Sequence, residues 1–267
     1  MYGVIGVLGL DDIRSGELIH IGDDKVPALV LNLEPQIIKA VLLGSYRSVG
    51  EGDLVVKASS LVSIGVNTSV LGRVIDIFGN SIDGGDDLTY EQLYPVDVKA
   101  PGIIQRQSIC ESMPTGIKAI DSMFPIGNGQ IELIIGDRQT GKTSVAIDAI
   151  INQQNNPLQM VCIYVAIGQK NSSVAHIVNK LKEFDSMHYT VVMIAVASEP
   201  ASLQFLAPYS GCTIGEWFRD NCMNALIVYY DLSKHAVSYR QVSLLLLRPP
   251  SIDAYPGDIF YLHSRLL

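Results

Sequence analysis

The segment at 132–148, ELIIGDRQTGKTSVAID, constrains the fold of this chain more than any other stretch. Its centre, GDRQTGKT at 136–143, matches the pattern GxxxxGK[ST] in full. The apolar run IELII at 131–135 predicts a strand before this loop, and apolar spacing over 143–153 predicts a helix after it. Strand, glycine-bounded loop and helix, in that order, are the context that a phosphate-binding P-loop requires. We therefore expect an α/β domain built around a P-loop.

The residue types in this loop suit phosphate oxygens. Glycines let successive backbone N–H groups point into one hollow, and the following helix adds the positive end of its dipole. Lys142 would reach the β- and γ-phosphates of a nucleotide, and the Thr143 hydroxyl would bind magnesium. The alternative is a chance match in a glycine-rich turn, which the flanking strand and helix disfavour.

The chain divides into three segments that differ in their residue patterns. Residues 1–65 are short apolar runs broken about every 8 to 12 residues by turn formers, which indicates antiparallel β structure in a small barrel or sandwich. Residues 66–130 are Gly- and Pro-rich connections with few helical stretches. Beyond residue 130, helices alternate with continuously apolar strands at 161–167, 190–197 and 225–230, which predicts a parallel sheet wrapped by helices. One of these helices should be capped near Ser172 and should bury one face formed by Val174, Ile177, Val178 and Leu181.

Composition argues against several classes of function. A net charge of −8, from 27 acidic and 19 basic residues, repels a nucleic-acid backbone. The four cysteines stand far apart without CxxC pairs, and the five histidines show no metal-ligand spacing. No apolar run approaches the roughly 20 residues that span a bilayer, and the first residues do not resemble a signal or import sequence. We expect neither nucleic-acid binding nor direct membrane insertion.

Hydrolysis would need further groups at the ends of neighbouring strands. The strand at 161–167 is followed by Gln169, whose amide can orient a water molecule but cannot accept its proton. Gln169 is equally compatible with an ordinary polar turn. The strand at 225–230 ends in Tyr230 followed by Asp231, where a magnesium-binding carboxylate is expected. Asp231 can serve only if the register allows it, and is otherwise an acid at the start of the next helix.

Motifs along the whole chain resemble the α subunit of the F-type ATP synthase, in its mitochondrial or bacterial form. They are GDRQTGKTS, CIYVAIGQK, LAPYSGC, LSKHAVSYRQVSLLL and AYPGDIFYLHSRLL, with LNLEP, EGD, LGRVIDIFGNSIDG and APGII nearer the start. The resemblance implies an N-terminal β-barrel at 1–65 and a RecA-like P-loop NTPase domain at 66–267. It also implies a chain that stops before the family's C-terminal helical bundle.

The same resemblance implies a site and partners. Gln139, Gly141, Lys142, Thr143 and Ser144 would line a site for ATP or ADP, with magnesium on Thr143 and no catalytic residue. Family α subunits bind Mg-ATP without turning it over, because glutamine stands where the catalytic β subunit has glutamate, and Gln169 holds that position here. The partners would be β subunits in a hetero-hexameric ring and the central stalk. The location would be the matrix side of the mitochondrial inner membrane.

Some residues depart from the family pattern. Family α chains have two aspartates where this sequence has Tyr230 and Asp231, and the first aspartate is the Walker B acid. Asn128 and Ile131 replace arginines that flank the family's GQ pair before the P-loop. Two alternatives therefore remain beside the non-catalytic ATP-binding subunit. One is a truncated paralogue that acts as an assembly partner or is a relic, and the other, least favoured, is a free-standing ATPase or nucleic-acid motor.

Overall fold

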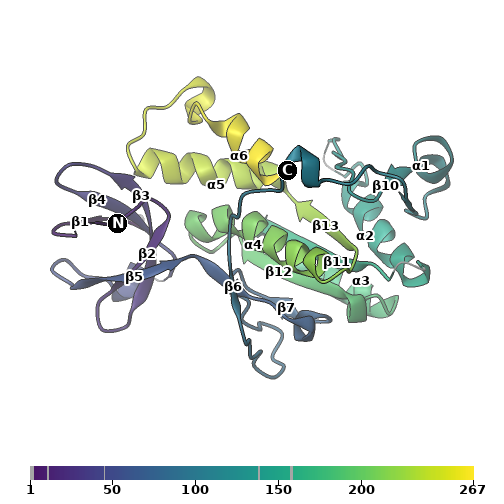
Figure 1. Cartoon of the computed structure of the whole chain (residues 1–267), viewed down its shortest axis with the longest axis horizontal. Helices are drawn as coiled ribbons and strands as arrows, with labels where there is room; N and C mark the ends of the chain where they lie inside the picture. The colour runs from purple at the N-terminus through teal and green to yellow at the C-terminus, as the bar shows by residue number, and fades with distance from the viewer. Residues whose placement is uncertain (1–2, 11, 45, 138, 157–158) are drawn as a thin grey trace.

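The computed structural model describes residues 3–10, 12–44, 46–137, 139–156 and 159–267 of the chain. Figure 1 shows the N-terminal strands at one end of the molecule and a sheet with its helices at the other. The C-terminal helices lie along the side that joins the two ends (Figure 1). The N-terminal β segment and the α/β segment thus occupy different regions of the molecule.

The N-terminal region is a five-stranded antiparallel sheet in the order β1-β4-β3-β2-β5. Its strands are β1 (Val4–Val7), β2 (Glu17–Ile21), β3 (Val26–Leu33), β4 (Ile38–Leu42) and β5 (Val55–Leu61). The alternating apolar side chains Ile19, Ile21, Ala28 and Val30 form a separate core with neighbouring apolar residues. The antiparallel expectation is met. Strands β1 and β5 are the two edges of this sheet, so its closure into a barrel stays a prediction.

The connecting region contains short strands and little helix. Its elements are β6 (Ser63–Gly65), β7 (Val74–Ile75), β8 (Leu93–Pro95), β9 (Ser112–Met113), α1 (Lys118–Met123) and β10 (Ile126–Gly127). Strand β6 pairs with β8, β9 pairs with β10, and β7 joins the edge of the parallel sheet. A bidentate ion pair connects the start of β7 to the turn that follows it. Arg73 Nε and Nη2 donate to the Asp83 carboxylate at 2.7 and 2.8 Å. This pair holds the pKa of Asp83 well below its usual range.

The second region is a parallel sheet in the order β13-β11-β12-β7. Its long strands are β11 (Val161–Gln169), β12 (Thr190–Val196) and β13 (Ala225–Tyr230), close to the predicted ranges. The helices are α2 (Lys142–Asn152), α3 (Asn171–Glu183), α4 (Ala201–Asp220), α5 (Leu232–Leu245) and α6 (Ile259–Leu266). The predicted alternation of parallel strands and helices is confirmed.

Helices cover both faces of this sheet. On β11, Cys162, Tyr164 and Ala166 face a core shared with Ile150 of α2 and Leu181 of α3. The intervening Val161, Ile163, Val165 and Ile167 face a core shared with α4, α5 and α6. A strand buried on two faces must be apolar at every position, which explains the unbroken run in the sequence.

The predicted strand at 131–135 is wrong for the described chain. These residues have no strand geometry, and their apolar side chains lie in solvent, with Leu133 70% and Ile135 82% exposed. An apolar run makes a strand only where a neighbouring edge pairs with its backbone. The outer edge of β13 has no such pairing among the described residues. The helix that follows the P-loop pattern is present, but the strand that should precede it is not.

Two long-range contacts hold the N-terminal sheet against the parallel-sheet region. The buried Ser202 hydroxyl, at the start of α4, donates to the carbonyl of Leu42 in β4 at 2.6 Å. Arg248, just beyond α5, donates from Nη2 to Asn32 Oδ1 at 2.9 Å and to the Leu31 carbonyl at 3.3 Å. Among the described residues, no helix is both long and apolar enough for a membrane span.

Candidate functional site

An open pocket of about 430 Å³ lies where β11 and β13 end and where α2 and α3 begin. Its lining residues are Thr143, Gln169, Ser172, Ser173, His176, Ile177 and Tyr230. Parallel strands end at one edge of a sheet, and the helices that follow them begin there. The topology therefore brings together residues that are up to 87 positions apart in sequence, from Thr143 to Tyr230.

Gln169 is directed by an irregularity at the end of β11. The pairing of β11 with β12 shifts register between Ile167 and Gln169, and Gly168 between them has φ of +60°. A side chain at position 168 would also crowd Gln204, whose Oε1 lies 2.8 Å from the place of a Cβ. Glycine thus allows the strand to bulge and Gln169 to face the pocket. Its Nε2 donates weakly to the Ile167 carbonyl at 3.4 Å.

The loop with the P-loop pattern contains two residues in the left-handed backbone region, and its phosphate-binding form stays a prediction. Gly141 has φ of +94° and caps the start of α2, and Gln139 has φ of +63°. The Lys142 ammonium donates to the carbonyl oxygens of Gly136 and Asp137 within its own loop. Position 138 of the pattern lies outside the described residues.

The structure brings only part of the predicted residue set to the pocket. Thr143 lines it together with Gln169. Gln139, Gly141, Lys142 and Ser144 lie in the adjoining loop and first helical turn but are not among the lining residues. The Lys142 side chain would have to leave its two loop carbonyls in order to contact a phosphate.

Three lining residues of α3 were missed by sequence reasoning. Ser172 and Ser173 stand on the first turn of the helix and His176 about one turn later, and all three are exposed. Their signal is present in the sequence, because residues i and i+4 after a strand end share one helix face. Ser172 itself lies inside the first turn, since α3 begins at Asn171 with Lys170 at its N-cap position.

The end of β13 settles the roles of its two polar residues. Tyr230 lines the pocket, and its ring stacks on that of Tyr164 in β11. Asp231 caps α5, because its carboxylate accepts a hydrogen bond of 2.8 Å from the Lys234 amide. Of the two readings left open for Asp231, the helix N-terminal acid is therefore the observed one.

The chemistry of this pocket is that of a hydrogen-bond donor surface. It offers hydroxyls from Thr143, Ser172, Ser173 and Tyr230, an amide from Gln169 and an imidazole from His176. These groups and two helix N-termini can bind the oxygens of an anion. The part of the lining that the structure describes contains no carboxylate, so it has neither a strong general base nor the oxygen ligand that magnesium prefers. The described residues also contain no cluster of three or more His, Cys, Asp or Glu suited to a metal ion.

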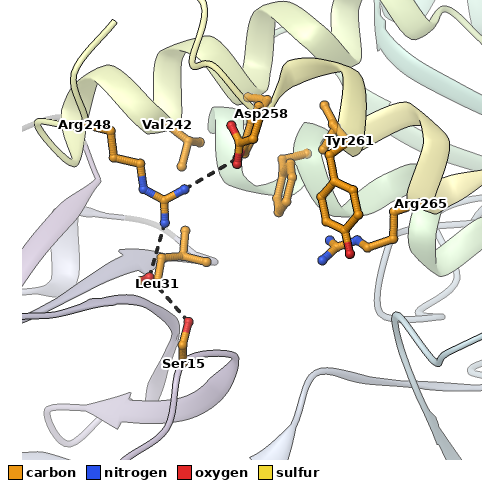
Figure 2. A pocket seen from close by; sticks show the side chains of 10 residues that line it. Ser15, Leu31, Val242, Arg248, Asp258, Tyr261 and Arg265 are labelled. Carbon is orange, nitrogen blue, oxygen red and sulfur yellow. Dashed lines mark hydrogen bonds between the residues drawn. The ribbon is translucent and has the colours of Figure 1, made fainter.

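A second pocket lies between the N-terminal sheet and the C-terminal helices, and its polar groups bond to one another. Figure 2 shows Arg248 extending to Leu31, whose carbonyl also accepts from the Ser15 hydroxyl at 3.4 Å. Tyr239 donates to Asp258 at 2.7 Å, and its hydroxyl accepts from Arg248 Nη1 at 3.5 Å. These contacts join elements of the fold, so we assign this pocket a structural role.

Comparison with known proteins gives one family for the chain. The model of the ATP synthase alpha/beta family, nucleotide-binding domain, matches residues 116–267. ATP synthase subunit alpha of Rickettsia canadensis is 55% identical over 271 aligned positions, which cover 99% of this chain and 53% of the relative. ATP synthase subunit alpha of Ehrlichia ruminantium is 54% identical over the same shares. The chain spans about half the length of the curated relatives it matches.

These relatives correct one expectation from the sequence. The resemblance implied a place on the mitochondrial inner membrane, but both Rickettsia and Ehrlichia are bacteria, which have no mitochondria. The mitochondrial location is therefore contradicted.

Proposed function

The chain belongs to the ATP synthase alpha/beta family, and we propose that it is an alpha-like subunit that binds ATP or ADP without hydrolysing it. The observation that carries this proposal is Gln169. It stands at the end of β11 and faces the pocket that Thr143 lines. An enzyme that hydrolyses a nucleotide must orient and deprotonate the attacking water. An amide can orient water but cannot take up its proton, and no described lining residue is a carboxylate that could do so.

The nucleotide phosphates would bind at the start of α2. Gly141 allows the close approach of the backbone, and Lys142 would exchange its loop carbonyls for phosphate oxygens. Thr143 would donate to the phosphates from the pocket wall. Gln139 and Ser144, which lie on either side, complete the proposed binding set. The N–H groups at the beginning of α2 have no intrahelical partners, which suits them to anionic oxygens.

Magnesium is the less well supported part of the expected cofactor pair. Thr143 is the one predicted protein ligand, and a hydroxyl beside phosphate oxygens is a known setting for this ion. The carboxylate that usually completes such a site is replaced by Tyr230 at the end of β13. Any magnesium that enters with the nucleotide would therefore depend on Thr143 and the phosphates alone.

The proposed partners are β subunits in a hetero-hexameric ring and the central stalk of a proton-transporting ATP synthase. Support comes from the relatives, which are named as ATP synthase subunit alpha. We also propose that residues 1–65 act as a β domain and residues 66–267 as the nucleotide domain. The contacts of Ser202 and Arg248 with the N-terminal sheet would keep the two in a fixed relation.

Calorimetric titration of the full chain with ATP tests the proposal. We expect saturable binding, and Lys142→Ala should weaken it by about tenfold or more, the loss of one charged phosphate contact. Lys182→Ala is the matched control, because Lys182 is exposed in the last turn of α3, away from the pocket, and should leave affinity unchanged. Absence of ATP binding at millimolar concentration, or equal affinities for all three proteins, would refute the assignment.

A hydrolysis assay and a pull-down complete the test. Phosphate release by the chain should not exceed that of Lys142→Ala, whereas turnover abolished by that substitution would identify an ATPase instead. Tagged chain should recover β subunits from a reconstituted mixture.

The structural alternative, a paralogue that assists assembly, is favoured by the apolar segment 131–135, which is open to a partner. Such a protein would recover β subunits without binding ATP, and a relic would do neither.

A further inference from the structure

Among the described residues, none that lines the nucleotide pocket is acidic. The described lining carries hydroxyl, amide, imidazole, phenol and aliphatic groups. The acids nearest in sequence are engaged or lie elsewhere. Asp231 caps α5 through the Lys234 amide, and Asp148 pairs with Lys180 at 3.7 Å on the flanks of α2 and α3. Asp137 is in the exposed loop and is not part of the lining.

Positive potential converges on the same pocket from two helices. Thr143 is the second residue of α2, and Ser172 and Ser173 are the second and third residues of α3. Each helix N-terminus behaves as about half a positive charge and presents free N–H groups. Lys142, at the start of α2, would add a full charge once its ammonium exchanged the Gly136 and Asp137 carbonyls for phosphate oxygens. These groups would offset part of the negative charge of a polyphosphate held here.

The lack of a carboxylate in the described lining and the two helix N-termini indicate that this site does not require a metal ion. Magnesium in nucleotide sites is usually held by carboxylate as well as by phosphate, and it offsets the charge of the polyphosphate. Here the described lining has no carboxylate, and the helix N-termini offset part of the charge. We propose that this site binds a nucleotide as the metal-free polyphosphate, with the Tyr230 hydroxyl, the Thr143 hydroxyl and the first turn of α3 in place of magnesium and its acid. The inference rests on the proposed nucleotide binding and specifies its chemical form.

The test is the ratio of ATP affinities with EDTA and with excess magnesium, measured by calorimetry on the full chain. We expect the two dissociation constants to agree within about threefold, less than 1 kcal/mol. A site that uses the metal should instead lose about tenfold or more in EDTA.

Substitutions that introduce a carboxylate provide the converse test. Tyr230→Asp should weaken binding in EDTA, because the acid repels phosphate, and should restore affinity when magnesium is added. Tyr230→Phe keeps the aromatic ring without adding charge, so its ratio should remain near that of the native chain. Ser173→Asp is a second variant that avoids disturbing the sheet, because position 173 is exposed and an acid in the first turn of a helix favours folding. It too should make binding depend on magnesium.

The outcomes separate the two proposals. Binding that needs magnesium in the native chain leaves the nucleotide-binding function intact and overturns the metal-free form. Absence of binding in both media overturns the function and this inference with it. If both aspartate variants, shown to be folded by circular dichroism, still bind ATP equally well with and without magnesium, the missing carboxylate does not determine the metal dependence of the site.

Discussion

Tyr164 and Tyr230 stack across β11 and β13 with their ring centroids 6.2 Å apart and their planes at 30°. Tyr164 lies opposite Val228, and Tyr230 lies opposite Ala166, so the two rings form a diagonal pair on one face of the sheet. Tyr164 is fully buried in the core beneath α2 and α3, whereas Tyr230 reaches the pocket. The pair therefore links the wall of the site to the hydrophobic core.

The Tyr164 hydroxyl gives a first prediction. It is buried without a hydrogen-bond partner among the described residues, and this burial raises the pKa of Tyr164. Tyr164→Phe keeps the ring stack and removes the unpaired hydroxyl. The free energy of unfolding should therefore rise, or fall by less than about 1 kcal/mol. Tyr164→Ala should cost about 3–5 kcal/mol through the cavity it leaves. Urea denaturation measures both, and equal losses for the two variants would contradict this account.

The bulge at Gly168 gives a second prediction. Alanine there must adopt φ near +60° and must displace Gln204. Gly168→Ala should lower the free energy of unfolding by roughly 1–2 kcal/mol from backbone strain alone. Gly257→Ala is the matched control, because no atom lies within 4 Å of its added Cβ and its φ is not positive. Thermal unfolding should show no loss for the control, and a neutral Gly168→Ala would mean that the bulge is not needed.

The histidine pair of the α4, α5 and α6 core predicts a pH dependence. His235 is fully buried, with its Nε2 3.1 Å from the Phe205 carbonyl oxygen and its ring stacked on His263 at 5.4 Å. Burial, followed by the nearby His263, lowers the pKa of His235 from 6.5 to about 4. In the unfolded chain His235 binds a proton below about pH 6.5, whereas in the native chain it does so only below about pH 4. The free energy of unfolding therefore falls as the pH falls from about 6.5 to about 4.

The free energy of unfolding should fall by about 2 kcal/mol between about pH 7 and pH 5. Most carboxylates titrate below this range, so they contribute little to the change. Denaturant unfolding at several pH values measures it. His235→Phe should begin from lower stability, because the contact with the Phe205 carbonyl is lost, but its slope with pH should be flatter. Burial lowers the pKa of His263 as well, so part of the slope should remain. An unchanged slope would show that His235 is not the titrating group.

The contacts between the two regions give a fourth prediction. Ser202→Ala removes the bond to the Leu42 carbonyl and should cost about 1 kcal/mol. Arg248→Ala removes the bonds to Asn32 and Leu31 and should cost about 2 kcal/mol. Both variants should speed proteolysis of the N-terminal sheet. Arg240→Ala is the control, because Arg240 lies in α5 but contacts Tyr255 and Asp253 instead of the N-terminal sheet. It should leave the rate of proteolysis unchanged. Equal cleavage rates in all variants would show that these hydrogen bonds do not hold the N-terminal sheet to the parallel-sheet region.

The sequence was sufficient to predict features that depend on local periodicity. The apolar runs of β11, β12 and β13 and the helix after GDRQTGKT follow from the side-chain pattern of each segment, and Gln169 and Tyr230 follow from their places at strand ends. Helix α4 escaped a clear prediction because Pro208, Gly211 and Gly215 interrupt its pattern. The two glycines are explained only by packing, since a Cβ on either would approach side chains of β11 or β13 to 2.4 Å.

Only the tertiary structure decided which segments meet. The strand predicted at 131–135 is absent because a strand needs a paired edge, and no local pattern states whether one is available. Ser172, Ser173 and His176 enter the pocket because the phase of α3 is fixed by the residues it buries on the sheet. Sequence alone thus determined the phosphate-binding pattern and the amide at Gln169. The donor-rich, carboxylate-free surface around them arises from non-local packing, which joins residues that no short-range rule connects.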